Sequence, residues 1–126
     1  MKKTILIIDD DEVFQKALSV KLNSLNYRVI SSFDGDDGYN KVVSENPDLV
    51  LLDIMLPKIN GMDLLRKMRL NKDIQRMPVL MTSNLSEIDF ISEGVTLGVK
   101  GYIVKSNESI DNVVNQVIDV LNAPAV

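Results

Sequence analysis

The feature that most limits the fold of this chain is a series of five short apolar runs, each continuous rather than alternating with polar residues. Continuous runs of this kind are expected of strands that are buried on both faces of a parallel sheet. The runs are residues 5–8, 29–30, 49–52, 79–81 and 102–104. Segments with helical spacing lie between them, so strand and helix alternate. This alternation predicts right-handed crossovers and a three-layer α/β sandwich.

The segments between the runs carry their apolar residues on one side, as amphipathic helices do. Three of them, 14–25, 62–68 and 110–121, have clear apolar stripes, and two weaker ones are 36–44 and 86–97. We interpret the stripes as faces that pack on the sheet and not as cofactor sites.

The 126-residue chain has the length of a single domain. We expect that domain to span residues 1–122, with residues 123–126 as a short C-terminal tail or the stump of a linker. The first apolar run is too short for a membrane span, and cysteine is absent, so we expect a cytoplasmic protein without membrane contact. The net charge of −4 disfavours direct nucleic-acid binding. The absence of histidine excludes Ser-His pairs and His-ligated metal sites.

Polar side chains follow four of the five predicted strands. They are Asp9, Asp10 and Asp11 after the first strand, Asp53 after the third, Thr82 and Ser83 after the fourth, and Lys105 after the fifth. Taken singly, each has a structural explanation as a helix cap, an ion-pair partner or an acid at a helix N-terminus. Because the carboxyl ends of parallel strands meet at one edge of the sheet, we expect these side chains to converge there.

A cluster of carboxylates with a single lysine needs a further positive charge, since each carboxylate raises the pKa of the others. A hard divalent cation with oxygen ligands would supply it, and Mg²⁺ suits a site with few protein ligands. A cation and an ammonium group that face one carboxylate also form a receptor for a phosphoryl group. The sequence therefore predicts a phosphoryl-transfer site at this edge, in which one of the carboxylates attacks the phosphoryl group.

Four segments resemble the receiver domain of bacterial response regulators, and in particular its chemotaxis type. They are ILIIDDD, LVLLDIMLPKINGMDLL, VLMTSN and GYIVKS. They occur in the family's order and the resemblance covers essentially the whole chain. It implies a flavodoxin-like, doubly wound sheet of five parallel strands in the order 2-1-3-4-5, with five helices.

The resemblance also implies the roles of the acidic residues. Asp53 corresponds to the phosphoacceptor of a two-component phosphorelay. Asp10 corresponds to a direct ligand of Mg²⁺ (or Mn²⁺), and Asp9 to a residue that acts mainly through a metal-bound water. Asp53 and the main-chain carbonyl of Met55 complete the implied metal ligands.

Three further residues correspond to the family's switch. Thr82 matches the hydroxyl that moves onto the phosphoryl group, Lys105 matches the lysine that contacts this group, and Tyr102 matches the aromatic side chain that turns inward. Ser106 stands where the family usually has proline, so we expect a trans peptide bond and an altered direction for Lys105. Met55 flanks the expected path of the hydrolytic water, as Asn84 does, and we expect its bulk to lengthen the lifetime of the acyl phosphate.

These roles predict a signalling phosphoacceptor that catalyses only its own phosphorylation and dephosphorylation. Because the chain has no histidine, the phosphoryl group must come from a sensor histidine kinase, a phosphotransfer protein or a small phosphodonor. The fourth helix, fifth strand and fifth helix would present a face to an output protein or domain, or to a second copy in a homodimer. That face is expected to carry Glu87, Asp89, Glu93 and Lys100.

Three other functions compete with this interpretation. A metal-dependent aspartyl phosphotransferase would need a cap over its substrate and a general acid two residues after Asp53, where Met55 stands. A flavin carrier would need a loop rich in Ser, Thr and Gly after the first strand, where four acids stand instead. An unphosphorylated protein-binding module remains open because Ser106 departs from the family pattern.

Overall fold

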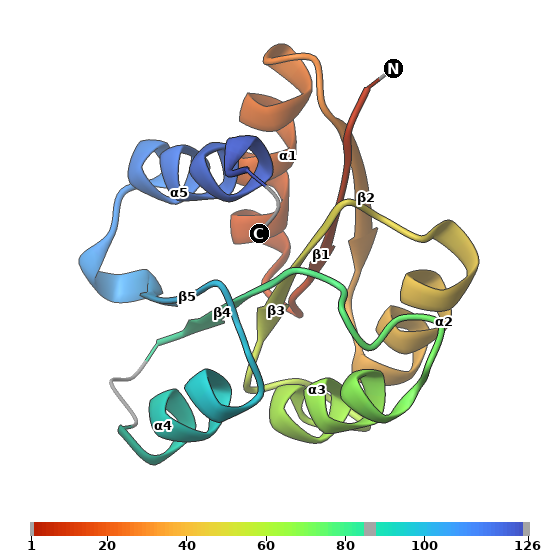
Figure 1. Cartoon of the computed structure of the whole chain (residues 1–126). Helices are drawn as coiled ribbons and strands as arrows, with labels where there is room; N and C mark the ends of the chain where they lie inside the picture. Colours follow the sequence, from red (N-terminus) through yellow and green to blue (C-terminus); the bar gives the residue numbers. More distant parts are fainter. Residues whose placement is uncertain (1, 85–87, 125–126) are drawn as a thin grey trace.

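The computed structural model, which describes residues 2–84 and 88–124, has the alternating strands and helices expected from the apolar runs (Figure 1). Its strands are β1 Thr4–Ile8, β2 Arg28–Ser32, β3 Leu49–Asp53, β4 Val79–Ser83 and β5 Gly101–Val104. Its helices are α1 Glu12–Ser24, α2 Gly35–Glu45, α3 Gly61–Leu70, α4 Ile88–Thr96 and α5 Ile110–Asn122, with a short 3₁₀ helix, η1, at Lys105–Asn107.

The five strands are parallel and lie in the order β2-β1-β3-β4-β5. Figure 1 shows α1 and α5 on one face of the sheet and α2, α3 and α4 on the other. Each face has its own apolar core, one built around α1 and α5 and the other around α3. The flavodoxin-like, doubly wound sandwich is therefore confirmed. The direction of winding reverses between β1 and β3, and ligands of such sheets bind at the carboxyl ends of the strands near this point.

The position of a strand in the sheet determines how well the sequence defines it. All residues of β3 and β4 are buried, so both appear as continuous apolar runs. The edge strand β2 pairs only with β1 and is mostly half-exposed. It therefore contains serine and arginine and extends beyond the two apolar residues that mark it in the sequence.

Side chains that precede the helices fix where they begin. The carboxylate of Asp11 accepts hydrogen bonds from the main-chain N–H groups of Val13 and Phe14 and caps α1. Asp34, Asn60 and Ser109 cap α2, α3 and α5 in the same way. Asp11 thus has the capping role that the sequence had left open for Asp9–Asp11.

Two arginines of α3 connect it to α4. Arg66 forms a two-point ion pair with Glu93, with its Nη2 2.6 Å from Glu93 Oε1. Arg69 donates from Nε to the carbonyl of Leu97, at 2.7 Å, just after α4. Glu93 of the expected docking face is therefore already paired. Glu87 lies outside the described residues, as does the side chain of Asp89. No helix in the described part of the chain is long and apolar enough to cross a membrane.

Candidate functional site

The predicted site residues lie together at the carboxyl edge of the sheet. Asp9 follows β1 directly, Asp53 is the last residue of β3, and Thr82 of β4 is the register partner of Asp53. Gly61, at the start of α3, lets the β3–α3 loop fold closely over this edge. A Cβ atom at Gly61 would lie 2.1 Å from the carbonyl oxygen of Asp53, so a side chain there would displace the strand end.

Three carboxylates form the centre of the site. Carboxylate oxygens of Asp9, Asp10 and Asp53 all lie within 4.8 Å of one another. Asp9 and Asp53 are buried, with 1% and 5% of their surface exposed, whereas Asp10 is open to solvent. Asp11 is excluded from this group because its carboxylate caps α1. The result is a half-open set of hard oxygen donors, which is the kind of site that binds Mg²⁺ or Mn²⁺.

Lys105 is the cation that faces these carboxylates. Its Nζ lies 2.8 Å from Asp9 Oδ2 and 3.8 Å from Asp53 Oδ2, so its stronger contact is with Asp9. The ammonium also lies 4.5 Å from the centre of the Phe14 ring, within the range of a cation–π contact. The sequence placed Lys105 at the end of the fifth strand, but it begins η1. No peptide bond in the described residues is cis, so Lys105–Ser106 is trans, as expected without a proline.

Burial and mutual repulsion dominate the electrostatics of the two buried acids. Burial, and then repulsion from Asp9, raise the pKa of Asp53 from 3.8 to about 7. Burial also raises the pKa of Asp9, although its hydrogen bond from Lys105 opposes this shift. One ammonium thus leaves the pair short of positive charge near neutral pH. A divalent cation would relieve this shortage, so these residues fit a metal ion on grounds of charge as well as ligand type.

Thr82 and Tyr102 lie on opposite faces of the sheet. Thr82 is fully buried, and its hydroxyl has no hydrogen-bond partner in the described part of the protein. Tyr102 is the register partner of Met81 and packs against the apolar core on the side of α3. The hydroxyl oxygen of Tyr102 is buried. Tyr102 as a whole is half-buried.

The rim of the site is formed by loop residues. Met55 has 62% of its surface exposed, and Asn84 is also exposed. Ser106 donates from its hydroxyl to the carbonyl of Asn84 at 3.4 Å, so the residue that replaces proline joins two loops of the rim. The main-chain N–H of Met55 helps to stabilise the ionised carboxylate of Asp53.

Sequence reasoning missed two residues of α1 that support the site, Phe14 and Gln15. Phe14 was assigned only to the core, yet its ring faces the ammonium of Lys105. Gln15 is 2% exposed and its amide reaches three main-chain carbonyls next to Asp9. A signal was present, since Gln15, Leu18 and Leu22 have the i, i+3, i+7 spacing of one helix face.

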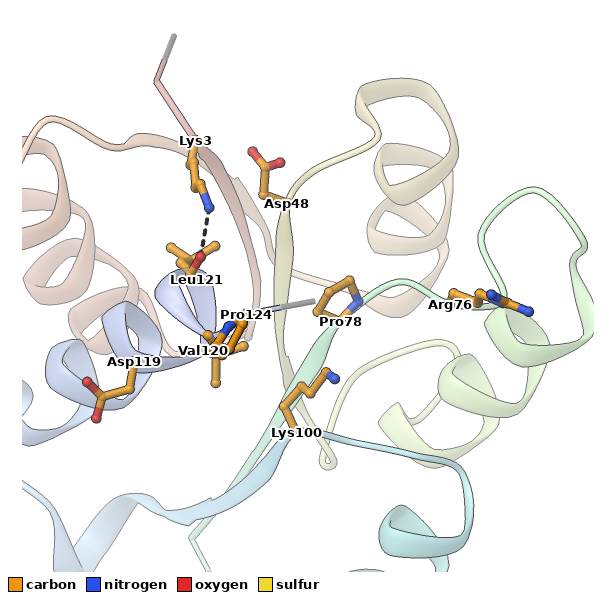
Figure 2. A pocket seen from close by; sticks show the side chains of 10 residues that line it. Lys3, Asp48, Arg76, Pro78, Lys100, Asp119, Val120, Leu121 and Pro124 are labelled. Carbon is orange, nitrogen blue, oxygen red and sulfur yellow. Dashed lines mark hydrogen bonds between the residues drawn. The ribbon is translucent and has the colours of Figure 1, made fainter. Parts of the chain in front are cut away.

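A pocket of about 550 Å³ lies at the opposite edge of the sheet (Figure 2). It is formed where the amino ends of the strands meet the end of α5. Its lining residues are Lys3, Asp48, Arg76, Pro78, Lys100, Asp119, Val120, Leu121, Ala123 and Pro124. None of them belongs to the acidic site.

The family model of the response regulator receiver domain matches residues 5–117, a stretch that includes every residue of the site described above. The chain belongs to the response-regulator receiver family. A receiver of this family is a phosphoacceptor of two-component signalling.

Curated relatives support the same assignment. The receiver is 37% identical to the response regulator ArlR of Staphylococcus aureus over 101 residues, which are 80% of this chain and 45% of ArlR. It is 36% identical over 104 residues to a protein of Porphyridium aerugineum named "Probable transcriptional regulator ycf27", covering 82% of this chain and 42% of that protein. The chain therefore spans less than half the length of these relatives.

Solved structures share the whole fold. The non-phosphorylated HemR receiver domain of Leptospira biflexa is 25% identical with a TM-score of 0.89, and the match covers 99% of this chain and 98% of that one. A CheY-like receiver of Methanospirillum hungatei JF-1 is 25% identical with a TM-score of 0.88, covering 97% and 95%. The response regulator Rcp1, solved in a Mn²⁺-bound form, is 26% identical with a TM-score of 0.83, covering 98% of each chain.

Proposed function

We propose that Asp53 accepts a phosphoryl group from a phosphohistidine of a sensor histidine kinase or a phosphotransfer protein, and that this modification switches a protein-interaction face. One observation carries the proposal. Asp53 is the last residue of a buried strand, and one of its carboxylate oxygens lies within 4.8 Å of a carboxylate oxygen of Asp9 and of Asp10. The Nζ atom of Lys105 lies 3.8 Å from Asp53 Oδ2. This arrangement pairs a nucleophile with the positive charge that an incoming phosphoryl group needs.

In the proposed reaction a carboxylate oxygen of Asp53 attacks the phosphorus atom of the donor. The new O–P bond forms as the N–P bond of phosphohistidine breaks, and the nitrogen keeps the electron pair. Lys105 leaves Asp9 and moves to a phosphoryl oxygen, because that oxygen offers its ammonium more negative charge. In hydrolysis a water oxygen attacks the phosphorus atom, the bond between phosphorus and the Asp53 oxygen breaks, and the Asp53 carboxylate and inorganic phosphate are released.

The acidic cluster would hold Mg²⁺ or Mn²⁺ through Asp9, Asp10, Asp53 and the main-chain carbonyl of Met55. A bound divalent cation would allow Asp53 to ionise near neutral pH and would neutralise phosphoryl oxygens. The donor set, the charge shortage of the buried pair and the Mn²⁺-bound form of the similar regulator Rcp1 support this assignment.

The switch would begin at Thr82. Its buried hydroxyl has no partner in the described residues, so a phosphoryl oxygen at Asp53 would be a suitable acceptor. A shift of Thr82 would change the packing at the neighbouring strand β5, where Tyr102 lies, and so bias the face formed by α4, β5 and α5. That face would contact an output protein or domain, or a second copy of the receiver.

We place the end of the receiver domain at residue 122, which is also where α5 ends. The longer relatives include a protein named as a transcriptional regulator. In this proposal, any comparable output of this protein acts through a separate domain or partner, and the receiver itself does not bind nucleic acid.

Intact-mass measurement after incubation with acetyl phosphate and Mg²⁺ tests the proposed function. We expect a gain of one phosphoryl group that is lost in Asp53→Asn and in the presence of a chelator. Asp73→Asn is the matched control, because it removes an exposed carboxylate in the loop between α3 and β4, and it should leave the gain intact. No gain with any donor would contradict the proposal and favour the alternative of a protein-binding module that uses the receiver fold without phosphorylation.

A further inference from the structure

Gln15 of α1 is a buried amide that joins the ends of two strands. Its Nε2 lies 2.8 Å from the carbonyl oxygen of Ile7, 3.1 Å from that of Asp9 and 2.8 Å from that of Ser32. Ile7 and Asp9 lie at the end of β1, and Ser32 is the last residue of β2. The three carbonyls determine the orientation of the amide, because the opposite orientation would place Oε1 against three other acceptors.

Every polar group of Asp9 is held in the structure. Its main-chain N–H donates to the carbonyl of Ser32 at 3.0 Å, and its main-chain carbonyl accepts from Gln15. Its carboxylate accepts from the N–H of Asp11 at 2.9 Å and from the ammonium of Lys105 at 2.8 Å. The Gln15 side chain thus holds the main chain of Asp9, the residue that carries this carboxylate.

Position 15 lies on the buried side of α1, where an apolar side chain would have no polar atoms of its own to pair but would leave the Asp9 carbonyl without its hydrogen bond from Gln15. Gln15 instead buries Oε1 without a hydrogen-bond partner among the described residues. An unpaired buried acceptor is unfavourable, so the amide needs a compensating benefit at the strand ends.

We propose that Gln15 is a positioning residue for the metal site: its amide holds the Asp9 main chain so that the carboxylates of Asp9 and Asp10 converge with Asp53. This inference rests on the proposed function, because it concerns the affinity of that site for its divalent cation. The two acids are consecutive, so a rotation of the peptide between them would turn both carboxylates. Contacts that orient metal ligands commonly change metal affinity by about 10- to 100-fold when they are removed.

Titration with Mn²⁺, followed by electron paramagnetic resonance, measures this affinity without reference to phosphorylation. Gln15→Met keeps the length of the side chain but cannot donate, and we expect the Kd for Mn²⁺ to rise about 10-fold. Gln15→Asn keeps the amide but shortens its reach by one methylene, and we expect a smaller rise in the same direction. If Gln15→Met does not fold, Gln15→Asn gives the same test.

Leu22→Ala is the matched control. Leu22 is fully buried on the same helix, two turns further from the site, so this change loosens the packing of α1 without touching Asp9. We expect its Kd to stay within twofold of the original. An equal Kd for the Gln15 variants, or an equal rise in Leu22→Ala, would overturn the positioning role. Failure of the unmodified protein to bind Mn²⁺ would instead overturn the metal site of the proposed function, and the inference with it.

Discussion

Replacing Asp53 with asparagine should stabilise the folded protein in the absence of divalent cations, and the gain should grow with pH. Burial, with repulsion from Asp9, raises the pKa of Asp53 from 3.8 to about 7 in the folded state. Between about pH 4 and pH 7 the folded state therefore keeps a proton that the unfolded state has released. The free energy of unfolding then falls as the pH rises through this window.

The size of the effect follows from the shift. About 3 pKa units at about 1.4 kcal/mol each correspond to a loss of about 4 kcal/mol by pH 8. Because Asp9 and Asp53 titrate together, the loss belongs to the pair, and removing Asp53 alone should recover about 2–4 kcal/mol of it. Near pH 4.5 the same substitution should change the free energy of unfolding by less than about 1 kcal/mol, since Asp53 is mostly protonated in the folded state there.

Urea denaturation followed by far-UV circular dichroism at pH 4.5, 6, 7 and 8, with a chelator present, measures these differences. Asp73→Asn, at an exposed loop position, is the control and should show no trend with pH. Addition of Mg²⁺ should narrow the gap at pH 8 by stabilising the protein that retains Asp53 more than the variant, which has lost one of the proposed ligands. A gap between Asp53→Asn and the unmodified protein that stays constant from pH 4.5 to 8 would refute the argument from burial and repulsion.

Three further predictions concern the reaction and the switch. Lys105→Met should slow phosphorylation by acetyl phosphate at least about 10-fold while leaving Mn²⁺ binding in place, because it removes the positive charge that faces the phosphoryl oxygens and frees Asp9; an unchanged rate in the mass time course, or loss of binding in the Mn²⁺ titration, would contradict this prediction. Thr82→Ala should alter the free energy of unfolding by no more than about 1 kcal/mol, because removal of a hydroxyl without a protein partner in the described residues is favourable and offsets the loss of a buried methyl group. The same variant should still be phosphorylated, yet NMR amide shifts of α4 and β5 should no longer respond, and a full response would speak against Thr82 as the switch. Met55→Asn should speed dephosphorylation several-fold, because it removes the bulk that we expect to keep water from the acyl phosphate. Stability should not change, since Met55 is 62% exposed; an unchanged dephosphorylation rate would contradict this role of Met55.

The order of strands and helices could be predicted from the sequence because the central strands are buried on both faces. In β3 and β4 every residue is buried, so burial leaves a continuous apolar run. The limits of β2 could not be predicted in this way. Its outer edge has no neighbouring strand, so polar residues cost little there and the apolar signal shrinks to two residues.

The acidic cluster could also be predicted from the sequence, but not which of its acids caps a helix and which face the site. The run Asp9, Asp10 and Asp11 gives no local sign of which acid caps α1, because all three could serve at a helix N-terminus. The choice depends on where the helix begins, and the structure places that cap at Asp11. The closer approach of Lys105 to Asp9 than to Asp53 could not be predicted either, since it depends on the 3₁₀ turn after β5.

The unpaired hydroxyl of Thr82 limits how complete the switch can be through this residue alone. A new hydrogen bond to a buried group of this kind contributes about 1–3 kcal/mol. Such a difference changes the ratio of two conformations by about 5- to 150-fold. A change from 1:99 to 99:1 needs about 10⁴-fold. In the proposed mechanism Thr82 therefore provides only part of a full transition. Either the active conformation is already populated before phosphorylation, or the movement of Lys105 from Asp9 to the phosphoryl group provides the remainder.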